Sequence, residues 1–261
     1  MRRTVGIILI SLAGGLMVLA TSGCTGTYGG ISNPMPMNAS ATGIWGGTDS
    51  VTGLSVTGYI DPAGEAVFIR ADGVQFAGAT QVSGDTLVAA VVGYANFGSA
   101  FNDGSTYGLG TLNGTVASGS TLTLSLSFTT NGGTAESGSW SLTFSTLTNS
   151  GSSLNTISAN YTDTASGSVI SISGSGVMTG QNPANSCVVN GTITIINSTY
   201  DIYQVSLTYE NCTGSYAVLN GLQLTGLAVL DPNSSPTQLT ISVAGASSSG
   251  KFGLTLYLQG S

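Results

Sequence analysis

The sequence contains no histidine and very little charge. Its 261 residues include four Lys and Arg, eleven Asp and Glu, and 41% apolar residues. Histidine is the commonest general base and a common metal ligand, so its absence excludes a conventional Ser-His-Asp triad. The few basic residues cannot supply the phosphate contacts that a nucleic-acid-binding surface needs. We therefore expect no nucleic-acid partner, no metal, no cofactor and no enzymatic activity.

The apolar stretch at the N-terminus is short. Arg2 and Arg3 precede an uncharged segment from Val5 to Ala20, which ends at small residues before Cys24. A positive start, a short apolar segment and small residues at the cleavage site are typical of a secretory signal peptide. About 16 apolar residues fall short of the roughly 20 that a membrane-spanning helix requires. Residues 1–23 are therefore predicted to be a signal peptide.

Cysteine occurs only three times, and the first follows this segment directly. The Ser22-Gly23-Cys24 ending resembles a bacterial lipobox, in which the cysteine is lipidated and becomes the first residue after cleavage. The resemblance implies a lipoprotein that carries palmitate on Cys24 and is anchored in the bacterial outer membrane. The protein could then face either the periplasm or the cell surface. Thr21 stands where a lipobox usually has leucine, so a soluble exported protein is the alternative.

The remainder of the chain is acidic after cleavage and begins with a tether. Arg70 and Lys251 then stand against eleven carboxylates, a net charge of −9. Residues 24–42 have no sustained periodicity and are rich in Gly, Ser, Thr, Pro and Asn. Such a composition predicts a flexible linker between the lipid and the folded body.

From residue 43 onward the dominant pattern is an alternation of apolar and hydroxyl side chains. Leu122, Leu124, Leu126 and Phe128 alternate with Ser and Thr, and residues 140–144, 203–209 and 252–258 repeat the pattern. A period of two predicts strands with one buried face. Short turn sequences such as Asp61-Pro62-Ala63-Gly64 separate them, and we expect 14 to 16 strands in an all-β antiparallel meander.

Two similar blocks of about 100 residues favour two modules over one large barrel. The first opens at Trp45-Gly46-Gly47-Thr48 and the second at Tyr161-Thr162-Asp163, and Gly151-Ser152-Ser153 is the natural joint. We therefore predict two tandem small β-barrel or sandwich-like modules, at residues 43–150 and 151–261.

Cys187 and Cys212 are predicted to form a disulfide, because an exported chain meets an oxidising compartment. Directly opposed cysteines would place the hairpin turn within Asn197–Asp201. In that register, however, Ile193 would oppose a polar residue, and a one-residue shift is needed to pair it with Val205. We therefore expect either a β-bulge near Val188 or Asn211, or a disulfide just outside the ladder.

No cluster of residues points to catalysis. Most aspartates stand in turn sequences, where they accept backbone hydrogen bonds, and no spacing singles out a carboxylate pair for glycoside hydrolysis. The segment Asn102–Ser105 is the best calcium candidate, but it lacks an EF-hand spacing, so no metal site is predicted. Four tyrosines, Tyr200, Tyr203, Tyr209 and Tyr216, form either a binding surface or alternating core residues.

The C-terminal half resembles a known family. Ser186-Cys187-Val188-Val189-Asn190-Gly191, Asn211-Cys212 and Thr225–Leu230 are similar to motifs of uncharacterised proteobacterial outer-membrane lipoproteins. The resemblance implies β modules, a paired cysteine and a lipid anchor, and it brings no activity.

Three functions are therefore considered. The favoured one is a lipid-anchored, non-catalytic binding or structural module, with the membrane as one partner and a protein or glycan as a possible second. The alternatives are an integral outer-membrane barrel and a carbohydrate-active enzyme.

Overall fold

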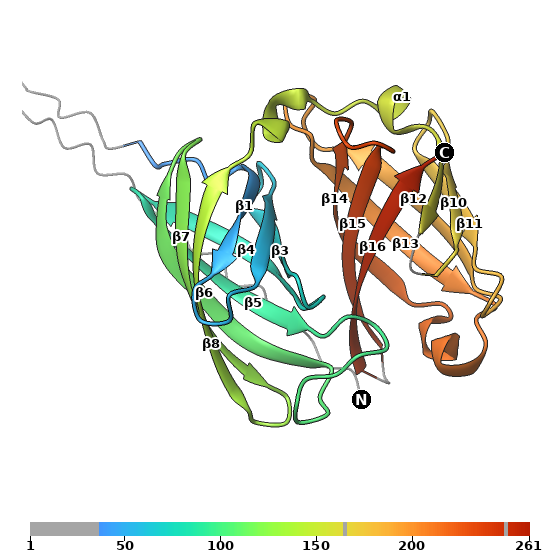
Figure 1. The fold of residues 1–261 in the computed structure, drawn as a ribbon, viewed down its shortest axis with the longest axis horizontal. Helices are drawn as coiled ribbons and strands as arrows, with labels where there is room; N and C mark the ends of the chain where they lie inside the picture. The colour runs from blue at the N-terminus through green and yellow to red at the C-terminus, as the bar shows by residue number, and fades with distance from the viewer. Residues whose placement is uncertain (1–36, 164–165, 248–249) are drawn as a thin grey trace, which may run out of the picture. The chain divides into compact units, whose positions relative to one another are not determined.

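The computed structural model describes residues 37–163, 166–247 and 250–261, and these residues form two closed β-barrels in tandem (Figure 1). Each barrel has eight antiparallel strands, and each strand pairs with its neighbours in sequence. The predicted all-β meander of two tandem barrel modules is confirmed. Within the described residues, no helix is long and apolar enough to cross a membrane.

The first barrel closes between its first and last strands, where Trp45 pairs with Phe144 and Asp49 with Trp140. Residues 38–41, which the sequence assigns to the tether, lie against one end of this barrel, where Asn38 Oδ1 accepts the Gly84 N–H at 2.8 Å. The strands are β1 (Gly43–Asp49), β2 (Ser55–Ile60), β3 (Glu65–Arg70), β4 (Gln75–Ser83), β5 (Thr86–Tyr94), β6 (Tyr107–Ala117), β7 (Thr121–Thr130) and β8 (Ala135–Phe144).

The second barrel closes through its short first strand, which pairs with both the second and the last. Its strands are β9 (Asn160–Asp163), β10 (Val169–Ile172), β11 (Val177–Gln181), β12 (Val188–Ile195), β13 (Tyr203–Glu210), β14 (Gln223–Asp231), β15 (Gln238–Ser247) and β16 (Gly250–Gly260). A 3-10 helix, η2 (Gly214–Leu219), lies in the connection between β13 and β14.

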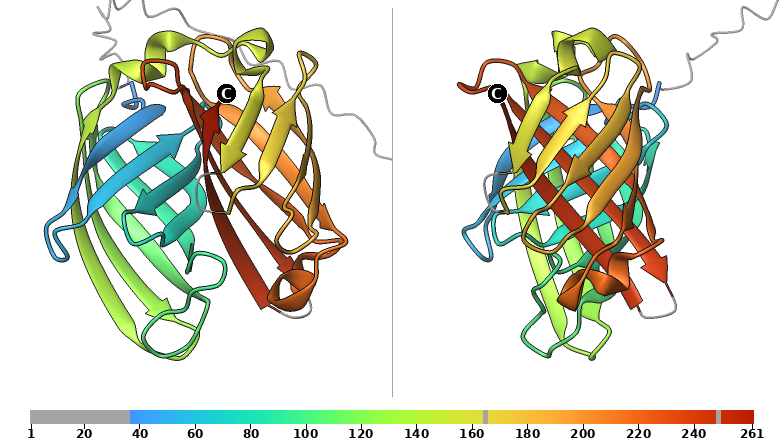
Figure 2. Two further views of the ribbon diagram at one scale, coloured as in Figure 1. Left: turned by 45° about the vertical axis from the view of Figure 1, so that its right-hand side comes forward. Right: turned by 90° about the vertical axis from the view of Figure 1, so that its right-hand side faces the viewer.

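The connection between the barrels holds η1 (Thr146–Ser150) and α1 (Leu154–Ile157), and it runs along one end of the pair (Figure 2). The backbone N–H of Ser152 donates to the Ser198 carbonyl at 3.2 Å, and that of Ser153 donates to the Tyr203 hydroxyl at 3.0 Å. These bonds fasten the connection to the second barrel.

Side chains fill the interior of the first barrel. Phe76 contacts both Phe128 and Trp140, with ring centroids 5.5 Å apart in each pair, and Phe68 lies 5.3 Å from Trp140. An eight-stranded barrel is just wide enough for side chains to fill. The alternation read from the sequence therefore places most apolar residues inside, and outward positions such as those of β7 carry Ser and Thr.

The disulfide between Cys187 and Cys212 is present and lies just outside the ladder. Strands β12 and β13 pair continuously from Val188 opposite Glu210 to Ile195 opposite Tyr203. Asn211 takes a left-handed backbone with φ of 57°, which accommodates the extra residue before Cys212. The second of the two predicted arrangements is therefore confirmed.

The barrels pack against each other through strands β3 and β14, which are buried on both faces. Phe68 points into the first barrel, whereas Val67 and Ile69 point outward and join Leu227 and Val229 of β14 in a separate apolar cluster. Unbroken apolar sequence is typical of a strand covered on both sides. This cluster is the centre of the interface between the barrels.

A buried polar contact supports one side of this interface. The Gln75 side chain, 1% exposed, donates through Nε2 to the Val243 carbonyl at 3.2 Å and accepts from the Ser242 hydroxyl. Nearby, a Cβ on Gly253 would collide with the Gln75 amide and with Tyr94. Glycine at position 253 therefore permits the close approach of the barrels.

Candidate functional site

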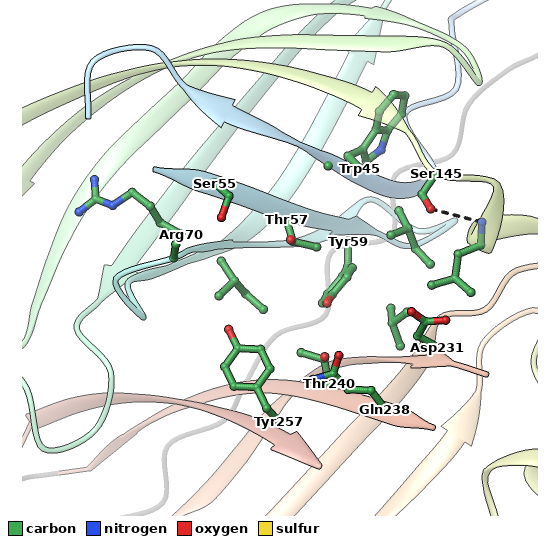
Figure 3. A pocket seen from close by; sticks show the side chains of 16 residues that line it. Trp45, Ser55, Thr57, Tyr59, Arg70, Ser145, Asp231, Gln238, Thr240 and Tyr257 are labelled. Carbon is green, nitrogen blue, oxygen red and sulfur yellow. Dashed lines mark hydrogen bonds between the residues drawn. The ribbon is translucent and has the colours of Figure 1, made fainter. Parts of the chain in front are cut away.

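A groove of about 580 Å³ lies on the other side of the interface, between the outer faces of the two barrels (Figure 3). Ile44, Ile69 and Val229, all buried, form its floor. Its walls carry polar side chains from both barrels, namely Ser55, Thr57, Ser145, Gln238, Thr240 and Tyr257, with Asp231 at one end. Ligand sites of small molecules commonly have volumes of roughly 300–1,000 Å³.

Strand alternation sets the side chains of the walls. Ser55, Thr57 and Tyr59 of β2 point out of the first barrel, because Val56 between them points into its core. Across the groove, Thr240 of β15 pairs directly with Tyr257 of β16. Two rigid sheets therefore present facing rows of hydroxyl groups.

Most of these polar groups are free of protein partners. Within the described parts of the chain, the side chains of Ser55, Thr57, Gln238 and Tyr257 hydrogen-bond with no other protein group. The Tyr257 residue is 42% exposed. These side chains are therefore available to donate to and accept from a ligand.

Tyr59 belongs to the floor and differs from Tyr257. It is 4% exposed, and burial raises the pKa of its hydroxyl, which a hydrogen bond with Thr240 partly opposes. The hydroxyl is neutral over the ordinary pH range and links the two barrels. Tyr257 presents the accessible ring of the groove.

The groove offers almost no charge to a ligand. Arg70 is one of the lining residues, but its guanidinium points away and contacts Asp72 at 2.8 Å and Glu136 at 3.8 Å (Figure 3). One carboxylate, Asp231, stands at the end of the groove, and its Oδ1 accepts the Asn233 N–H at 3.0 Å. The lining is therefore polar and close to neutral, with a slight acidic bias.

A smaller cavity of about 200 Å³ lies beside the connection between the barrels and is lined in part by Asp201. Asp201 is 2% exposed, and its Oδ2 has no hydrogen-bond partner among the described residues. Burial raises the pKa of this carboxyl to about 7; the Leu230 N–H opposes this shift, and the charge of Asp231 adds to it. The carboxyl therefore holds a proton up to near-neutral pH.

The residues singled out in the sequence do not meet at the groove. Cys24 lies outside the described residues, and the disulfide lies at the opposite end of the second barrel from the β12–β13 turn. Tyr203 and Tyr209 are core residues, 0% and 7% exposed, so the binding-surface interpretation is wrong for these two. Tyr216 is half-buried and stacks on Phe97 at 5.0 Å.

The turn aspartates have the backbone roles expected of them. Asp61 accepts the N–H groups of Ala63 and Glu65, each at 2.8 Å. In the calcium candidate segment, hydrogen bonds from Ser105 and Thr130 lower the pKa of Asp103. Among the described residues, no group of three or more His, Cys, Asp or Glu side chains is placed to hold a metal.

Sequence reasoning missed the groove, because its residues come from six strands and the connection between the barrels. One signal was available: Ala66–Ile69 and Leu227–Leu230 are apolar runs without alternation, which mark strands buried on both faces. Polar residues on the outer faces of neighbouring strands could then have been assigned to the margin of an interface.

Comparisons of the chain with protein-family models, with characterised proteins and with solved structures find no match. The fold and the groove alone define the class, a tandem pair of filled eight-stranded barrels with an external groove between them.

Proposed function

We propose that this chain is a lipid-anchored lipoprotein of the bacterial outer membrane that acts as a non-catalytic binding module. Cys24 carries the lipid, and the groove between the barrels is the ligand site. The observation that carries the proposal is a groove of about 580 Å³ in which four polar side chains, those of Ser55, Thr57, Gln238 and Tyr257, have no protein hydrogen-bond partner among the described residues. Unpaired polar groups on a rigid concave surface are typical of a recognition site.

The exterior of the barrels disfavours the alternative of a membrane-spanning barrel. The outward positions of β7 are Thr121, Thr123, Ser125, Ser127 and Thr129, all exposed, and the leucines of this strand point inward. A membrane-spanning barrel presents an apolar band to lipid. A lipid on Cys24 is therefore the better means of attachment.

The acidic groups of the groove disfavour the alternative of a carbohydrate-active enzyme. Glycoside hydrolysis commonly uses two carboxyl groups that flank the scissile bond. Among the described residues, Asp231 is the one carboxylate that lines the groove, and one of its oxygens accepts the Asn233 N–H. A binding role needs no second carboxylate.

Two measurements on the full chain in a Gram-negative host test the proposal. Labelled palmitate should be incorporated by the wild type and not by Cys24→Ser. The wild type, purified from membranes in detergent, should capture a component of the native envelope that Gly46→Arg fails to capture. Gly46 lines the groove, and a Cβ added there meets no atom within 4 Å, so the backbone tolerates a side chain and the arginine is expected to occupy part of the groove.

Gly174→Arg is the matched control. It adds the same side chain in an exposed turn of the second barrel, where a Cβ would make one ordinary contact with Asn155 at 3.6 Å. It should label and capture like the wild type. Equal labelling of Cys24→Ser, or capture that Gly46→Arg leaves unchanged, would contradict the proposal.

A further inference from the structure

We infer that the ligand of the groove is a neutral oligosaccharide segment. This inference rests on the proposed function, since it takes the groove as the ligand site and adds the chemical class of the ligand. A pyranose chain presents apolar C–H faces edged by hydroxyl groups that both donate and accept hydrogen bonds. The groove has the matching arrangement, with an apolar floor and hydroxyl and amide groups along both walls.

The polar groups of the walls suit hydroxyl partners. The hydroxyls of Ser55, Thr57 and Tyr257 can each donate and accept hydrogen bonds. The Gln238 side chain offers an NH2 donor and a carbonyl acceptor in one plane. All four side chains lack a protein partner among the described residues. An acyl chain bound here would leave these groups desolvated and unpaired, which costs free energy.

The charge distribution disfavours ionic ligands. An anionic ligand would meet Asp231 and no opposing cation, because the Arg70 guanidinium is engaged by Asp72 outside the groove. A polycation would find one carboxylate that is already partly satisfied by the Asn233 N–H. A neutral ligand avoids both costs.

The closed barrels also disfavour an extended peptide. Peptides often bind by adding a strand to a free sheet edge, where backbone groups are unpaired. Every strand in the described residues has a neighbouring strand on each side, although β9 pairs only with Leu258–Gly260 of β16, so little free edge is left for a peptide strand. Recognition therefore falls mainly to the side chains of the groove.

Tyr257 is the residue expected to contribute most. Its ring is exposed and stands on the wall opposite Ser55 and Thr57 (Figure 3). An aromatic ring combines a large apolar face with a polar tip, which suits stacking against a sugar face. The inference therefore assigns Tyr257 as the stacking platform.

The test is isothermal titration of the full chain in detergent with four hexasaccharides. Cellohexaose and chitohexaose are neutral, oligogalacturonate is anionic, and the chitosan hexamer is cationic. We expect saturable binding of a neutral probe, at least about tenfold tighter than either charged probe, and loss of binding in Gly46→Arg. Tyr257→Ala should weaken it about tenfold, and Tyr257→Phe, which keeps the ring, should stay within about threefold. Gly174→Arg and Tyr200→Ala, which lie outside the groove, should bind like the wild type.

The inference is overturned if no neutral probe binds, if a charged probe binds as tightly, or if Tyr257→Ala changes nothing while its thermal unfolding matches the wild type. The envelope capture experiment separates this failure from failure of the proposed function. Capture that depends on Gly46 and is not competed by the neutral probes identifies a ligand of another class, such as a protein. If neither envelope capture nor oligosaccharide binding depends on Gly46, the groove is not the ligand site.

Discussion

Asp201 makes the stability of this protein depend on pH near neutrality. In the folded chain its carboxyl is 2% exposed with one unpaired oxygen, and its pKa rises from 3.8 to about 7. Between these values the folded state holds a proton that the unfolded state releases. The stability contribution is therefore fully present below about pH 4 and is lost as the pH rises through about 7.

The magnitude follows from the size of the shift. One pKa unit corresponds to about 1.4 kcal/mol, so a shift of roughly three units gives at most about 4 kcal/mol, and we expect about 2–4 kcal/mol. Asp201→Asn keeps the shape of the protonated carboxyl and cannot ionise. The variant should exceed the wild type in free energy of unfolding by at most about 1.5 kcal/mol at pH 5, where the unfolded carboxyl is already ionised, and by about 2–4 kcal/mol at pH 8.

Urea denaturation followed by circular dichroism at the two pH values measures this difference. Asp85→Asn, which replaces an exposed turn carboxylate, serves as the control and should change the free energy of unfolding by less than about 0.5 kcal/mol at either pH. A stability difference between Asp201→Asn and the wild type that is equal at pH 5 and pH 8 would refute the reasoning.

Three further predictions concern packing and cross-linking. Phe76→Ala removes the ring that touches both Phe128 and Trp140 and should lower the free energy of unfolding by about 3–5 kcal/mol in urea melts; an unchanged midpoint would contradict a filled barrel. Gln75→Ala leaves the Ser242 hydroxyl and the Val243 carbonyl unpaired and should cost about 1–3 kcal/mol by the same measurement, whereas a neutral result would show that water replaces the amide. Reduction of the disulfide, which closes a loop of 25 residues, should lower the free energy of unfolding by about 3 kcal/mol. Dithiothreitol should therefore lower the thermal midpoint of the wild type and leave the midpoint of a double Cys→Ser variant unchanged.

The strands and their inward faces were predictable because their signals are local. The alternation at Leu122–Phe128 gives β7, whose leucines are buried and whose hydroxyls are exposed. The disulfide position was also predictable, since the conflict between the cysteine spacing and the Ile193–Val205 pairing left two arrangements, and one of them is present.

The closure of each sheet depended on contacts between distant residues. Trp45 and Phe144 are about 100 residues apart and pair only because the twist and tilt of eight strands bring the last strand to the first. Local periodicity is the same in a sandwich and in a barrel, so the sequence left both open.

The sequence by itself determined the alternating strands, the turns and the pairing of Cys187 with Cys212, because each depends on neighbours in the chain or on residues across one hairpin. Only the tertiary structure decided the environment of the outward-facing residues. Packing of β3 on β14 buries the outward-facing Ile69 and Val229. Outward-facing residues of the neighbouring strands, such as Thr57 and Thr240, line the groove instead. The tertiary structure also leaves Tyr257 exposed on its wall and, beside the connection, buries Asp201 with an unpaired oxygen. Burial by a second module depends on where that module docks, and no local pattern encodes it.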